Sequence, residues 1–244
     1  MNEVKISVII ATRNRESILY TTLETAIAAI RYKPVEIIVV NDGEQDLVVP
    51  ERFNSMIRVF NNPRRGVSSA RNFGASTAKG SVLFFIDDDM WIVPEAIDWI
   101  DKQFRMEQNR GAVYNLNWEY PSTLYKKLNN SKIGRFLLDA EYNTMWGRMH
   151  EKGIKPQKGL YKFHSIASCS LVMHNTIFQK VGGYNEQLIF QGEDIDLSNR
   201  LRLMSIPVFV VFDVTLFHNH QDRLDLKQDL GRLSSGYKSE FEAA

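Results

Sequence analysis

The chain has 244 residues and nearly balanced charge, with 30 Lys and Arg against 29 Asp and Glu, for a formal net charge of +1. This length suits one domain with a sizeable core, and the lack of a strong basic excess argues against a nucleic-acid partner. The single cysteine, Cys169, excludes an internal disulfide, so we expect a reducing, cytoplasmic location. We find neither a signal-peptide pattern nor an apolar run near the ~18 residues of a membrane span, and expect at most peripheral contact with the inner face of a membrane.

The first ninety residues alternate between apolar runs and segments with helical periodicity. An apolar run followed by turn residues is typical of a buried strand, and apolar residues three and four apart are typical of a helix. On these criteria, strands are predicted at 6–11, 35–40, 57–60 and 82–86, and helices at about 17–31 and 67–78. This order predicts an α/β unit with a parallel sheet.

The second half is less regular. Residues 125–149 mix basic, apolar and aromatic side chains without a clean period, and we expect a loop there, either a lid over an acceptor or a plain solvated insertion. A strand is predicted before it, at 113–118. Beyond it, strands are predicted at 165–173, 208–212 and 216–220, with helices at 176–181 and from Gly192 onward. Residues 221–244 form a polar C-terminal tail with helical character around 224–233.

Three consecutive carboxylates, Asp87, Asp88 and Asp89, follow the apolar run 82–86. They stand at the carboxyl end of a predicted strand, where open α/β sheets bind ligands. Side chains two apart on an extended chain face the same way, so Asp87 and Asp89 are expected to share one pocket while Asp88 faces elsewhere. Because adjacent carboxylates repel and hard divalent cations prefer oxygen, the triplet predicts a metal site. An acidic loop facing water is the plainer alternative.

Six motifs follow one another over roughly residues 5 to 220. They are VIIATRN at 8–14, VVNDG at 39–43, GVSSARNFG at 66–74, the aspartate triplet with Pro94, GGY at 182–184 and GEDIDL at 192–197. Their order resembles that of family 2 glycosyltransferases of the GT-A fold. The resemblance implies an α/β, GT-A nucleotide-diphospho-sugar transferase fold with a mostly parallel central sheet flanked by helices. It also implies one catalytic domain at 1–220, with a nucleotide-binding half (about 1–110) and an acceptor half (about 111–220).

The resemblance further implies a nucleotide-sugar donor, a UDP-sugar by preference, and a divalent cation, Mn²⁺ or Mg²⁺. Asp42 matches the family residue that accepts hydrogen bonds from the nucleoside, and Arg71, expected in a helix's first turn, would meet phosphate oxygen. An Asp-Gly turn and a surface arginine are the plainer explanations. The expected donor-site residues are Thr12, Arg13, Asn14, Asp42, Arg71, Asp87 and Asp88.

The catalytic residues implied by the resemblance are Glu193 and Asp194, with Asp194 as the general base. We expect the helix macrodipole to lower the pKa of Asp194 and keep it ionised, although both acids could simply stabilise the helix start. The implied metal ligands are Asp89, Asp87 and His218. His218 is the better match within His218-Asn219-His220, with a structural or acceptor-side role left open.

Two departures limit the resemblance: Asn41 replaces the first acid of the usual Asp-Asp pair, and Met90 stands where many relatives have another Asp. The implied reaction is inverting sugar transfer to a glycan, lipid-linked or protein acceptor, in surface polysaccharide or glycan synthesis. Two alternatives are a sugar-1-phosphate nucleotidyltransferase, although the glycine-rich loop after the first strand is missing, and a non-catalytic nucleotide-sugar or glycan-binding module. Four aromatic residues could stack on sugar rings or pack in the core: Trp118, Tyr125, Trp146 and Tyr161.

Overall fold

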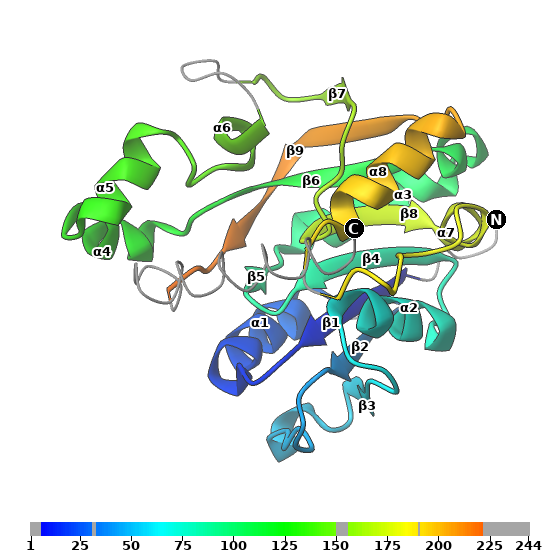
Figure 1. Ribbon diagram of the computed structural model, residues 1–244, viewed down its shortest axis with the longest axis horizontal. Coiled ribbons are helices and arrows are strands. Elements are labelled where there is room, and N and C mark those ends of the chain that lie inside the picture. The colour runs from blue at the N-terminus through cyan, green and yellow to red at the C-terminus, as the bar shows by residue number, and fades with distance from the viewer. Residues whose placement is uncertain (1–5, 31–32, 150–155, 190, 222–244) are drawn as a thin grey trace.

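The computed structural model describes residues 6–30, 33–149, 156–189 and 191–221, so the predicted tail beyond 221 lies outside the described residues. Within them, a nine-stranded sheet forms the centre of the fold in the order β3-β2-β1-β4-β8-β6-β9-β5, with β7 paired to β9 (Figure 1). The strands are β1 Ile6–Thr12, β2 Val35–Asn41, β3 Ile57–Asn61, β4 Val82–Asp87, β5 Met90–Trp91, β6 Val113–Glu119, β7 Leu160–Phe163, β8 Ser170–His174 and β9 Val208–His218.

The first half of the sheet is parallel, as predicted. Strand β1 pairs in parallel with β2 and β4, and β2 pairs in parallel with β3. The register sets Thr12 beside Asn41 and Ala11 beside Asp87. The polar ends of three strands therefore meet at one edge of the sheet.

The second half makes the sheet mixed. Strand β8 is antiparallel to both β4 and β6, and β9 is parallel to β6 but antiparallel to β5 and β7. The predicted α/β class is confirmed, and parallel pairing dominates only among β1 to β4.

Helices cover both faces of the sheet. One apolar cluster packs α1 and α3 on one face, and another packs α7 and α8 on the other, with α2 beside them (Figure 1). The α-helices are α1 Glu16–Ala29, α2 Val67–Thr77, α3 Pro94–Arg105, α4 Tyr125–Asn129, α5 Lys132–Asp139, α6 Met145–Met149, α7 Asn175–Lys180 and α8 Glu193–Leu203, and short 3₁₀ turns lie at Glu51–Phe53, Glu107–Gly111 and Ser122–Leu124. No helix in the described ranges has the length and hydrophobicity of a membrane span.

Two predictions about the second half are wrong. Residues 125–149 contain the three helices α4, α5 and α6 instead of a loop. The sequence pattern did not reveal them, because helices of five to eight residues are too short to show a clear hydrophobic period. The strands predicted at 208–212 and 216–220 are one strand, β9. A register shift against β6, in which Leu116 pairs with Val211 but Asn117 pairs with Thr215, absorbs the intervening residues as a bulge.

A tight contact between α4 and α5 gives the first prediction. A Cβ added to Gly134 would lie 2.2 Å from the Leu128 carbonyl oxygen and 2.4 Å from its Cα. Helix propensity alone predicts that Gly134→Ala stabilises the protein by up to about 1 kcal/mol. The backbone clash predicts the opposite sign, a loss of about 1–3 kcal/mol in the free energy of unfolding. Chemical denaturation measures the change.

The matched control is Gly111→Ala, because a Cβ there meets no heavy atom within 4 Å. Stabilisation by Gly134→Ala would contradict the α4–α5 packing.

Candidate active site

The acidic strand end is the first element of the site. Strand β4 ends at Asp87, and the chain turns at Asp88 and Asp89 before entering β5. Asp87 Oδ1 accepts a hydrogen bond from Arg71 Nη2 at 2.9 Å, whereas Asp88 and Asp89 both pair with Arg15. The prediction that Asp87 and Asp89 share one pocket is therefore wrong. The extended chain ends at Asp87, so Asp88 and Asp89 both pair with Arg15, whereas Asp87 pairs with Arg71.

Arg15 was missed as a site residue by the sequence analysis. It follows β1, and its guanidinium Nη2 lies 2.9 Å from Asp89 Oδ2 while Nη1 contacts Asp88. Thr12 Oγ1 donates to Asp88 Oδ2 at 2.8 Å. Burial raises the pKa of Asp88 to about 7 against the opposing effect of Arg15, with Asp89 adding to the rise. Asp88, expected to bind the donor, instead ties the end of β1 to the turn after β4.

The ends of β1 and β2 form the neighbouring wall. Asp42 Oδ1 accepts from Asn62 Nδ2 at 2.6 Å and from the Gly66 amide at 2.9 Å. Gly66 has a φ of 119°, which favours glycine, and it caps α2. Asn14, which is exposed and has a φ of 53°, brings its side chain against Gly43. The structure thus brings Asn14 and Asp42 to one edge, with the partly exposed Arg13 preceding Asn14.

Arg71 lies deeper than predicted. It stands in the second turn of α2 instead of the first, and its side chain is only 5% exposed, which excludes the alternative of a surface arginine. Its Nη1 donates to Glu193 Oε1 at 2.8 Å, opposite its bond to Asp87, and its Cζ lies 5.3 Å from the centre of the Tyr184 ring. Burial disfavours the charge, but Tyr184 and the two carboxylates outweigh it and raise the pKa of Arg71. Arg71 therefore joins the end of β4 to the start of α8.

Asp194 is held by a second network, through a serine that the sequence analysis did not assign. Its Oδ1 accepts from the Ser168 amide at 3.2 Å and from the Ser168 hydroxyl. Ser168 is buried, and its Oγ in turn accepts from Tyr184 Oη at 2.8 Å. Among the described residues, Oδ2 of Asp194 has no hydrogen-bond partner. One carboxylate oxygen is thus fixed while the other remains available to a ligand.

The ionisation of Asp194 differs from the prediction. Burial raises its pKa to about 6, and the adjacent Glu193 adds to the rise, while Arg71 and Ser168 oppose it. The expected lowering by the helix macrodipole is outweighed by desolvation. A carboxylate with a pKa near 6 is mostly ionised at neutral pH and more basic than an exposed aspartate, which suits a general base.

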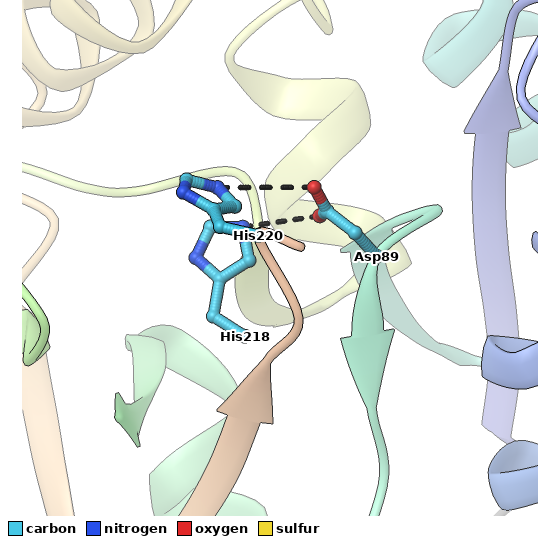
Figure 2. Close-up of side chains that lie close together, drawn as sticks. All are labelled: Asp89, His218 and His220. Carbon is cyan, nitrogen blue, oxygen red and sulfur yellow. Dashed lines mark hydrogen bonds and ion pairs between the residues drawn. The ribbon is translucent and has the colours of Figure 1, made fainter. Parts of the chain in front are cut away.

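Three buried side chains gather at the ends of β5 and β9. Asp89, His218 and His220 each offer one ligand atom, and these atoms lie within 4.8 Å of one another (Figure 2). His218 Nε2 lies 3.0 Å from Asp89 Oδ1, and His220 Nε2 lies 3.8 Å from Asp89 Oδ2. Of the three predicted metal ligands, Asp89 and His218 lie in this cluster together with His220, whereas Asp87 pairs with Arg71 outside it.

The cluster fits a divalent cation by its donor set. One carboxylate and two imidazoles suit first-row transition-metal ions better than Mg²⁺, which prefers oxygen ligands. Tyr120 Oη lies 2.7 Å from His220 Nδ1, which orients that ring with Nε2 toward Asp89.

The fold is shared with solved glycosyltransferase structures. GalNAc-T7 with UDP, GalNAc and Mn²⁺ superposes with a TM-score of 0.64 at 18% identity, covering 89% of this chain and 44% of that one. Residues 1–349 of S. aureus TarS superpose with a TM-score of 0.60 at 15% identity, covering 88% and 60%.

Sequence relatives are named as glycosyltransferases. Glycosyltransferase GlyA of Streptococcus pneumoniae serotype 4 is 28% identical over 213 residues, covering 84% of this chain but only 29% of GlyA. The Escherichia coli UDP-Glc:alpha-D-GlcNAc-diphosphoundecaprenol beta-1,3-glucosyltransferase WfaP is 34% identical over 181 residues, covering 62% of this chain and 72% of WfaP. The family model described as Glycosyl transferase family 2 matches residues 7–181. The chain therefore belongs to glycosyl transferase family 2.

Proposed function

We propose that this chain transfers a sugar from a nucleoside diphosphate sugar to an acceptor hydroxyl, with inversion at the anomeric carbon. The observation that carries the proposal is the Asp194 carboxylate, fixed by Ser168 at one oxygen and available at the other, at the start of a helix that Arg71 ties to the acidic end of β4. A UDP-sugar is the donor we propose, in line with the UDP and GalNAc in the GalNAc-T7 structure.

The chemistry is a single displacement. Asp194 takes the proton from the acceptor hydroxyl, and the acceptor oxygen forms its bond to the anomeric carbon. The bond from that carbon to the diphosphate oxygen breaks, and the nucleoside diphosphate leaves with the electron pair. Attack opposite the leaving group inverts the configuration. Glu193, which bonds to Arg71, holds the helix start in place and does not take the proton.

The donor would lie along the edge formed by the ends of β1, β2 and β4. In this proposal Asp42 and Asn14 face the nucleoside, Thr12 and Arg13 border the diphosphate, and Asp87 lies toward the sugar. Asp89, His218 and His220 would hold a divalent cation, Mn²⁺ by preference. Such an ion, when bound, offsets the negative charge of the diphosphate.

The second prediction concerns Asp194→Asn. The amide cannot accept the proton, so we expect donor hydrolysis, with water as acceptor, to slow by about 10²-fold or more while donor affinity is unchanged. Turnover of UDP-sugars and calorimetry measure the two quantities. The control is Asp196→Asn on the same helix, whose carboxylate pairs with Arg200. Donor affinity lost together with turnover would assign Asp194 to the donor site.

A pH profile checks the same role independently. Because the pKa of Asp194 is raised to about 6, the base is ionised above that pH and becomes protonated below it. Hydrolysis by the unmodified chain should therefore fall about tenfold per pH unit below 6 and level off above it. The hydrolysis rate of the Asp194→Asn variant should not fall in this way below pH 6. If the same fall persists in the variant, it reports the titration of a group other than Asp194.

The third prediction concerns the cation. His220→Ala removes one of three ligands, so Mn²⁺ affinity, measured by paramagnetic resonance of free Mn²⁺ in the presence of UDP, should fall at least tenfold. His164→Ala is the control, because His164 is exposed and outside the cluster. Equal Mn²⁺ affinities in the two variants would exclude this cluster as the cation site.

We also propose peripheral contact with an anionic membrane surface, through a basic aromatic patch on α5 and the turn after it. Phe136 and Tyr142 are 59% and 42% exposed and contact each other edge to face, and the exposed Lys132 and Arg135 stand on the same helix as Phe136. Such contacts typically place aromatic rings in the membrane interface and basic side chains against the anionic lipid headgroups. The named acceptor of WfaP, a diphosphoundecaprenol, supports a lipid-linked acceptor.

The fourth prediction tests this patch. Co-sedimentation with phosphatidylglycerol vesicles should be lost in Phe136→Ser and at high salt, and kept in Val48→Ser, whose side chain is also highly exposed but lies elsewhere. Equal sedimentation of both variants would remove the membrane role.

A further inference from the structure

A cavity of about 560 Å³ lies on the acceptor half, and its lining contains none of the residues assigned above to the donor edge, the cation cluster or the base. It is lined by residues of β6 and β9, by residues of the α4–α6 segment, and by Pro156 and Lys158. The lining includes Asn117, Glu119, Glu141, Asn143, Trp146 and Phe212. A volume in this range fits a small-molecule ligand.

The lining combines two kinds of surface. Trp146 and Phe212 meet edge to face with ring centroids 5.3 Å apart and give an apolar wall. The carboxylates of Glu119 and Glu141 and the amides of Asn117 and Asn143 supply the polar wall. A sugar ring presents both a C–H face, which packs on aromatic rings, and hydroxyls, which hydrogen-bond to carboxylates and amides.

The charge of the lining selects among such ligands. Among the lining residues that the structure describes, two carboxylates and one cation, Lys158, face the cavity, so their formal balance is negative. Phosphorylated or carboxylated sugars would be repelled. An uncharged sugar ring is the ligand class that fits both the rings and the charge.

The position of the cavity links it to the proposed base. Side chains of Asn115, Asn117 and Glu119 lie on one face of β6, because residues two apart on a strand point the same way. Asn115 holds the turn before Ser168: its Nδ2 donates to the Ala167 carbonyl oxygen at 2.6 Å and its Oδ1 accepts from the Ala167 amide at 3.1 Å. Ser168 binds Asp194. The cavity thus begins one strand repeat, about 7 Å, along β6 from the residue that supports the base.

We propose that this cavity binds an uncharged sugar ring of the acceptor glycan, one that precedes the sugar presented to Asp194. That the sugar belongs to the acceptor rests on the proposed function. The binding of a neutral sugar in this cavity does not. In this arrangement the α4–α6 segment selects the acceptor by its glycan and has no contact with the donor.

The experiment measures binding to the full chain without donor. Methyl glycosides of glucose, galactose and N-acetylglucosamine are titrated by saturation-transfer NMR, with glucose 6-phosphate as the charged comparison. We expect at least one methyl glycoside to bind saturably and glucose 6-phosphate not to bind. Glu119→Gln keeps the shape but loses the charged acceptor, and should weaken binding about tenfold.

Two controls make the result decisive. Glu107→Gln changes an exposed carboxylate outside the cavity and should leave binding unchanged. Glu141→Gln repeats the test on the other carboxylate in case Glu119→Gln folds poorly. No saturable binding by any of the three methyl glycosides, tighter binding of glucose 6-phosphate, or equal binding by all folded variants would overturn the proposal.

Donor hydrolysis separates this inference from the proposed function. If the chain binds a methyl glycoside but hydrolyses no UDP-sugar, the sugar-binding cavity stands and the transferase proposal fails. If it hydrolyses a UDP-sugar but binds no methyl glycoside, the transferase proposal stands and the sugar-binding cavity fails.

Discussion

The buried guanidinium of Arg71 is the interaction on which the site depends. It joins Asp87, at the end of β4, to Glu193, at the start of α8, and these two carboxylates lie in different halves of the chain. Tyr184 covers the guanidinium on a third side. Removing one member of a buried ion pair typically costs about 3–5 kcal/mol, because the other charge stays buried without compensation. The relative placement of the donor edge and the proposed base therefore depends on one side chain.

The same contact explains why two adjacent acids have different roles. Glu193 bonds directly to Arg71, whereas Asp194 is held by the neutral Ser168 hydroxyl and amide. Arg71 lowers the pKa of Asp194 less than burial and the charge of Glu193 raise it. Arg71 pairs with Glu193, and Asp194 keeps a raised pKa. The helix macrodipole acts on both acids alike, so it would not by itself give them different roles.

The sequence predicted the parts of the fold that depend on local pattern. Strands β1, β2 and β4 are long apolar runs, and their polar ends meet because parallel strands share an edge. Arg15 could not be assigned in this way, because its partners lie 73 and 74 residues away and depend on the order of strands in the sheet. Helices α4–α6 are shorter than the window that reveals a period, and the bulge in β9 made one strand resemble two.

The cation cluster shows how backbone pairing places ligands that no spacing predicts. Strand β5 has only two residues, and its pairing sets Met90 opposite His218. The Asn219 amide also donates to the Asp89 carbonyl oxygen at 2.7 Å. These bonds fix the backbones of Asp89 and His218 beside each other before any ion binds. Ligands on paired strands lose less freedom on binding than ligands on a loop. The turn at Asp88–Asp89, which broke the expected alternation, is what allows β5 to reach β9 and form the cluster.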